Sequence, residues 1–164
     1  MNTLDFLKRV CPDRDAIVVT QYNNNKNIFW NREVFTYAEL DDAAANMALW
    51  DKNPEATIYY SVGAFADNIV TTDEGKQKIR RTQDKATFFK SLCFDLDCGG
   101  DKPYKTQRDG LIKLAEVVKE LKLPKPLIVS SGIGAHVYWV LDKCISKQQW
   151  VQVSKALSAA LASK

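Results

Sequence analysis

Two short segments in the second half of the chain carry the residue types from which an active site could be built. The first, Phe94-Asp95-Leu96-Asp97, alternates two carboxylates with apolar side chains. The second, residues 130–139 with the sequence SSGIGAHVYW, contains the only histidine, His136. Carboxylates bind divalent cations, and a histidine beside a glycine turn can bind phosphate. Together the two segments predict an enzyme that handles a nucleoside triphosphate.

Asp95 and Asp97 are predicted to form a cation site at the end of a strand. Residues two apart on a strand share a face, so the two carboxylates can converge. Like charges this close repel each other unless a cation lies between them, and hard oxygen ligands suit Mg²⁺ or Mn²⁺. Gly99 and Gly100 follow and leave room for a ligand near the backbone. The alternative is a polar strand end that leads into a turn, because D-x-D is a common pattern.

The segment around His136 is predicted to be a hairpin turn that holds an anion. Gly132 and Gly134 permit positive φ and expose backbone N–H groups, and Ser130 can add a donor. The Nε2–H group of the histidine could bond a phosphate oxygen. The alternative is a tight turn with a histidine that only packs. The functional interpretation requires that both segments lie on adjacent strands, at matching ends.

The hydrophobic pattern predicts the order β–α–β–β–α for the second half. Residues 88–97 form the first strand, and its two faces alternate: Leu92, Phe94 and Leu96 on one, Cys93, Asp95 and Asp97 on the other. A capping box of Thr106 and Asp109 starts a helix, and strands follow at 127–131 and 136–141. The last helix is expected to turn one apolar stripe inward: Trp150, Val153, Leu157 and Leu161.

This order contains most of the split β-α-β module seen in RNA-recognition-motif folds. The first half predicts hairpin strands at 16–20 and 28–30, a helix from Thr36 to Trp50, and a strand at 56–62. We therefore expect an α/β (α+β) fold in one compact domain, with an N-terminal α/β subregion at 1–53 and the module at 54–164.

Composition limits the alternatives. The 164 residues are 46% hydrophobic and 26% charged, which suffices for a core without disulfides. A net charge of +3 does not by itself predict nucleic-acid binding, but one stretch gathers basic residues: Lys76, Lys78, Arg80, Arg81, Lys85 and Lys90. Four cysteines without a C-x-x-C pair, with one histidine, favour reduced thiols over a zinc site. Without an apolar span or a signal peptide, we expect a cytoplasmic protein that does not enter the membrane.

The two segments resemble the motifs of the archaeo-eukaryotic primase (AEP) superfamily, especially its phage-type primase-polymerases. The family's first motif, two acids on an apolar strand, matches Cys93-Phe94-Asp95-Leu96-Asp97. Its second motif, s-S-G-x-G-x-H-x-Y-W, matches at Ser130, Ser131, Gly132, Gly134, His136, Tyr138 and Trp139. The resemblance covers roughly residues 55 to 164, including the helix between the motifs.

The resemblance implies a DNA primase or polymerase domain that takes part in DNA replication. It implies that Asp95 and Asp97 bind Mg²⁺ or Mn²⁺, and that Ser130, Ser131 and His136 hold the phosphates with the two glycines of the turn. It also implies that the basic residues Arg80, Arg81 and Lys85 contact nucleotide or template. The implied partners are nucleoside triphosphates and a single-stranded DNA template. The resemblance also allows a replicative helicase as a partner, either fused to the chain or separate. A phage-encoded chain would act in the host cytoplasm.

The family's third motif, a further acid on a later strand, has no counterpart before Lys164. The sequence leaves three alternatives open. The first two are an enzyme whose remaining acid lies elsewhere and a non-catalytic nucleotide- or DNA-binding module with an incomplete metal site. A third alternative is a phosphatase, because Asp95-Leu96-Asp97-Cys98-Gly99 is similar to the nucleophile loop of haloacid-dehalogenase-type hydrolases. That alternative lacks the loop's threonine and leaves His136 unexplained.

Overall fold

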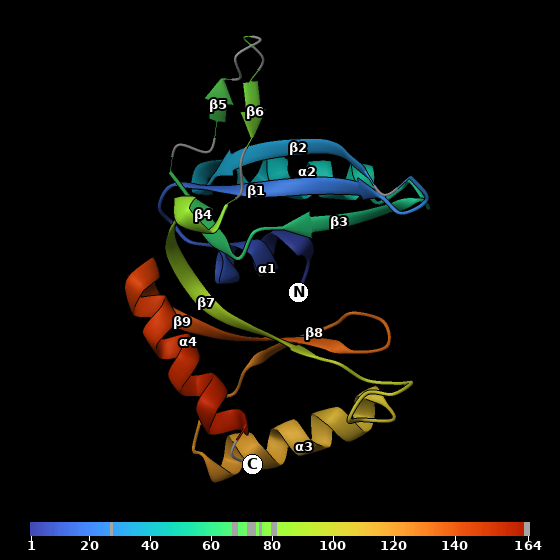
Figure 1. The fold of residues 1–164 in the computed structure, drawn as a ribbon, viewed down its shortest axis with the longest axis vertical. Coiled ribbons are helices and arrows are strands. Elements are labelled where there is room, and N and C mark those ends of the chain that lie inside the picture. Colours follow the sequence, from blue (N-terminus) through green and yellow to red (C-terminus); the bar gives the residue numbers. More distant parts are fainter. Residues whose placement is uncertain (27, 67–68, 72–74, 76, 80–81, 163–164) are drawn as a thin grey trace. The chain divides into compact units, whose positions relative to one another are not determined.

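The computed structural model describes residues 1–26, 28–66, 69–71, 75, 77–79 and 82–162. The chain forms two compact units, and each is discontinuous in sequence (Figure 1). The first unit comprises Met1–Lys90 and Asp142–Lys147, and the second comprises Ser91–Leu141 and Gln148–Lys164. The expected boundary between residues 53 and 54 falls within the first unit.

The first unit is built around strand β1, which has partners along both edges. Its elements, in chain order, are α1 (Thr3–Val10), β1 (Ala16–Asn23), β2 (Ile28–Thr36), the 3₁₀ turn η1 (Tyr37–Glu39), α2 (Leu40–Trp50), β3 (Ala56–Tyr60), β4 (Gly63–Phe65), β5 (Ile69–Thr71), β6 (Gln77–Ile79), η2 (Gln83–Lys85) and the beginning of β7 (Ala86–Leu96). Strand β1 pairs antiparallel with β2, β3 and β4. Its residues Ile17, Val18 and Val19 are buried, as expected for a central strand.

Several features of the first unit differ from the sequence expectations. The strand expected at 28–30 extends to Thr36, and the strand expected at 56–62 ends at Tyr60. The capping box of Thr36 and Glu39 is present, but it starts the 3₁₀ turn η1, and the α-helix begins at Leu40. Helix α1 was not predicted, because its eight residues form little more than two helical turns and so show too few repeats of the apolar spacing. Asn2 caps this helix by accepting a hydrogen bond from the backbone N–H of Asp5 at 2.8 Å.

The second unit has the predicted order β–α–β–β–α. Strand β7 is followed by α3 (Gln107–Glu120), β8 (Leu127–Ser130), β9 (Ala135–Ser146) and α4 (Lys147–Ala162). Strand β9 lies between β7 and β8 in the sheet, and β8 and β9 form an antiparallel hairpin. The capping box of Thr106 and Asp109 at the start of α3 is confirmed. The fold is therefore α+β, as the sequence predicted.

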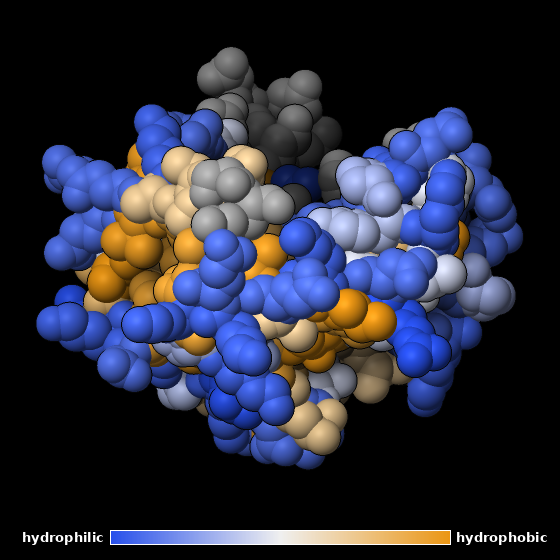
Figure 2. Space-filling model, turned by 90° about the horizontal axis from the view of Figure 1, so that it is seen from below, coloured by the Kyte–Doolittle hydropathy of each residue, from blue (hydrophilic) through white to orange (hydrophobic). Residues whose placement is uncertain are grey.

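Helices α3 and α4 cover one face of this sheet. Buried Leu92, Val137 and Trp139 form the centre of the core. Side chains of both helices pack against them: Leu114, Val118, Trp150, Leu157 and Leu161. The prediction for Val153 was wrong, because this side chain is 43% exposed. Figure 2 shows the molecule from below, the side on which α3 lies in Figure 1. Hydrophobic residues are visible between hydrophilic ones on this surface.

A membrane crossing requires a helix that is both long and apolar. Among the helices of the described residues, none meets that requirement.

Candidate active site

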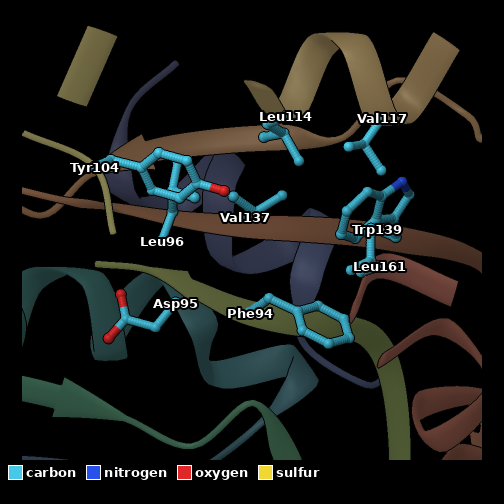
Figure 3. Close-up of a pocket in the computed structure, with 9 residues that line it drawn as sticks. All are labelled: Phe94, Asp95, Leu96, Tyr104, Leu114, Val117, Val137, Trp139 and Leu161. Carbon is cyan, nitrogen blue, oxygen red and sulfur yellow. The ribbon is translucent and has the colours of Figure 1, made fainter. Parts of the chain in front are cut away.

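The two faces of strand β7 separate core residues from carboxylates. Leu92, Phe94 and Leu96 pack into the core of the second unit, which fixes the register of the strand. Phe94 and Leu96 also line an apolar cavity of about 170 Å³ beneath α3. Asp95 borders this cavity, but its carboxylate is turned away from the apolar side chains (Figure 3). The predicted alternation is thus confirmed at the strand's end.

The histidine lies on the neighbouring strand and reaches the same carboxylate. Nε2 of His136 is 3.8 Å from Oδ1 of Asp95, and the two side chains are 44% and 64% exposed. This separation is too long for a hydrogen bond and leaves both groups able to take a ligand. The ring of Tyr138 packs edge-on against the imidazole, with ring centres 6.4 Å apart. Because Tyr138 is buried, it supports the histidine from within the sheet.

The turn between β8 and β9 is held close to the end of β7. The backbone N–H of Ser131 donates to the carbonyl of Gly134 at 3.0 Å, which closes the turn. Gly132 has the expected positive φ, 97°. Gly134 does not, and a different constraint acts there: a Cβ at this position would lie 2.5 Å from the carbonyl oxygen of Leu96. The turn therefore packs on the backbone between the two aspartates.

The two serines of the second segment occupy different positions. Ser130 pairs with Ala135, one residue from His136, so its side chain lies on the opposite face of the sheet. Its hydroxyl accepts a hydrogen bond from Nε2 of Gln107 at 3.0 Å. Ser131 lies in the turn itself and is exposed.

Gln107 is a site residue that the sequence did not reveal. It is the first residue of α3, and its Nε2 donates both to Ser130 and to the carbonyl of Gly134, the latter at 2.6 Å. It thus ties the helix to the turn. The only signal in the sequence was its place directly after the helix cap, which does not indicate a distant partner.

Lys102 is a second residue that the sequence did not reveal. Its Nζ donates to Oδ2 of Asp97 at 2.7 Å. The hydrogen bond and charge of Asp97, with a smaller contribution from Asp95, raise the pKa of the lysine above its ordinary value. The carboxylate pair is therefore partly neutralised by a side chain of the following loop.

Cys93 lies on the same face of β7 as the two aspartates, and its side chain is partly buried. Burial raises the pKa of its thiol, a hydrogen bond with Tyr138 acts in the opposite direction, and the charge of Asp95 raises it further. The thiol is thus kept in its neutral form beside the carboxylate. All four cysteines are free, as predicted.

The basic residues expected to contact nucleotide belong to another part of the chain. Arg80 and Arg81 lie outside the described residues. Lys85 ends the turn η2 in the first unit, whereas all site residues above belong to the second unit.

The carboxylate pair suits a divalent ion such as Mg²⁺ or Mn²⁺. Both side chains are more than half exposed, and the ammonium of Lys102 already lies against Asp97 as a cation would. Within the described ranges, no group of three or more His, Cys, Asp or Glu side chains is arranged to hold a metal. Mg²⁺ is commonly bound by one or two carboxylates together with substrate phosphates and water, so two acids fit that mode.

Comparison with known proteins relates this geometry to a solved fold. No protein-family model matches the chain, and no curated protein matches it either. Among solved structures, the chain is similar to the AEP domain of the primase-polymerase (PrimPol) of cyanophage S-2L. The TM-score is 0.58 and the sequence identity is 16%, over 98% of this chain and 72% of that chain. The chain therefore has an AEP-like fold.

Proposed function

We propose that this chain is a primase-polymerase domain that transfers nucleotides from nucleoside triphosphates onto a primer, directed by a single-stranded DNA template. The observation that carries the proposal is the position of His136, 3.8 Å from Asp95 on the adjacent strand. The motifs and the AEP-like fold give further support. In this reaction the primer 3′-oxygen forms a bond to the α-phosphorus, and pyrophosphate leaves.

Each site residue has a role in this proposal. Asp95 and Asp97 hold Mg²⁺ or Mn²⁺, which when bound lowers the pKa of the 3′-hydroxyl and neutralises charge on the leaving pyrophosphate. His136 donates through Nε2 to a β- or γ-phosphate oxygen. Backbone N–H groups and the Ser131 hydroxyl of the turn add donors beside it. Gln107 and Ser130 position the turn from the other face of the sheet.

The first prediction concerns the carboxylate. Asp95→Asn keeps the shape of the side chain but removes its charge. We therefore expect primer extension with Mn²⁺ to fall at least about a hundredfold, which is the order of magnitude seen when one electrostatic contact to the transition state is removed. The measurement is incorporation of labelled nucleotide into a primer annealed to a single-stranded DNA template. Asp142→Asn, at an exposed acid of β9 in the first unit, is the matched control and should keep full activity.

The result separates this proposal from a binding module. If the wild-type chain binds dATP but makes no product under any metal condition, the chain binds nucleotide without catalysis. If the Asp95 variant synthesises at the wild-type rate, the assignment of this carboxylate is wrong.

A further inference from the structure

The loop after β7 brings a positive charge back onto the carboxylate pair. Lys102 follows Asp97 by five residues, and its Nζ lies 2.7 Å from Oδ2 of that aspartate. Asp95 also contributes to the electrostatic field at this ammonium. The loop thus places a monovalent cation at the point where the proposed function requires a divalent one.

The return of the loop is fixed by its backbone. Gly99 and Gly100 have φ values of 82° and 53°, which glycine adopts without strain. The N–H of Gly99 donates to the carbonyl of Tyr104 at 2.7 Å, and the N–H of Lys102 donates to the carbonyl of Gly99 at 3.0 Å. These bonds form a tight turn that ends with Lys102 facing back toward β7.

This ion pair is poorly placed to serve stability. Both side chains are more than half exposed, 54% for Lys102 and 55% for Asp97, and exposed pairs contribute little to folding. The pair is therefore better explained by what it does to ligands of the carboxylates. An ammonium group on a flexible four-carbon chain can leave one anion for another at small cost.

We propose that Lys102 is a tethered cation: it neutralises Asp97 while no metal is bound, is displaced when Mg²⁺ or Mn²⁺ binds, and then donates to the phosphates of the bound nucleoside triphosphate. The inference rests on the proposed function of the site. A divalent ion at the carboxylates repels the ammonium. The triphosphate, in turn, presents several anionic oxygens to the three N–H donors of a lysine.

The test measures binding rather than activity. Lys102→Met keeps the length of the side chain but removes its charge and its competition with the metal. We expect the variant to bind Mn²⁺ roughly three- to tenfold more tightly than wild type. The affinity is obtained from the concentration of free Mn²⁺, which electron paramagnetic resonance measures. At saturating Mn²⁺, its affinity for dATP should fall roughly tenfold in calorimetry, because a charge-assisted contact is lost.

Two further variants complete the design. Lys105→Met removes an exposed lysine of the same loop and should leave both affinities unchanged. Lys102→Arg keeps the charge and should keep Mn²⁺ affinity near that of wild type. Equal Mn²⁺ affinity in wild type and Lys102→Met, or weaker binding by the variant, overturns the inference alone. Failure of wild type and every variant to bind Mn²⁺ overturns the proposed function as well.

Discussion

At the scale of single residues, the two aspartates have different surroundings. Asp97 is held by Lys102, whereas Asp95 faces the imidazole of His136 at 3.8 Å. A ligand that arrives at the site therefore meets one carboxylate already paired with a cation and another that lies next to an imidazole ring. The histidine is thus suited to contact the ligand itself, because its Nε2 has no hydrogen bond to Asp95 at this distance.

The second prediction follows from this position. His136→Ala should weaken dATP binding about tenfold or more, because a phosphate donor is lost, while affinity for single-stranded DNA stays within about twofold of wild type. Calorimetry with dATP and fluorescence anisotropy with a labelled oligonucleotide measure the two affinities. The variant should fold, since the side chain is 44% exposed. Equal dATP affinity in variant and wild type would remove the histidine from the site.

At the scale of elements, the site depends on how α3 holds the turn between β8 and β9. Gln107 donates two hydrogen bonds, to Ser130 and to the carbonyl of Gly134. Gly134 in turn packs against the carbonyl of Leu96 in β7. The chain of contacts from α3 to the turn to β7 sets the position of the turn relative to the carboxylates.

The third prediction tests this link. Gln107→Met keeps the shape of the side chain but removes both hydrogen bonds, so we expect a loss of unfolding free energy of about 1–2 kcal/mol. The dATP affinity should fall severalfold as the turn loosens, and DNA affinity should not change. Arg108→Met, at the exposed neighbouring position, is the control. A variant that loses stability but keeps its dATP affinity would show that Gln107 supports the fold only.

The sequence predicted local features of these elements better than distant ones. The two faces of β7 follow from alternation within one strand, so Asp95 and Asp97 could be placed from the sequence alone. That His136 lies on a strand adjacent to the first one was a requirement of the functional interpretation, because the spacing of the two segments does not by itself fix the order of strands in a sheet. The contacts of Lys102 and Gln107 could not be predicted, because they depend on the path of a glycine turn and on the register of a hairpin. The side of the sheet that Ser130 faces depends on the same register.

At the scale of the whole molecule, the described residues form two units, and a buried thiol in the first unit makes stability depend on pH. In the first unit, Cys11 is fully buried at the end of α1. Burial raises the pKa of its thiol from 9.0 to about 12, while Lys90 lowers it in part. The folded protein therefore keeps this proton at pH values where the unfolded chain has lost it, so stability falls as the pH rises from 9 towards 12.

The fourth prediction concerns this pH range. Each pH unit between the two pKa values should remove about 1.4 kcal/mol of unfolding free energy through this thiol. Between pH 8 and pH 10.5, wild type should therefore lose about 2 kcal/mol more than Cys11→Ala, which cannot ionise there. Guanidinium denaturation at both pH values gives the comparison. Equal losses in the two proteins would mean that the thiol does not contribute to the pH dependence.

The interleaving of the two units in sequence has a consequence for how this domain can be engineered or recombined. The chain passes between the units at 90/91, 141/142 and 147/148. The first passage lies within β7, the second lies within β9, and the third follows the first residue of α4. A chimaera that exchanges the carboxylate-bearing unit with that of a relative must therefore be spliced inside two strands and at the start of a helix, rather than in linkers. An exchanged unit that contains Asp95 and His136 therefore also brings the adjoining segments of β7 and β9 with it.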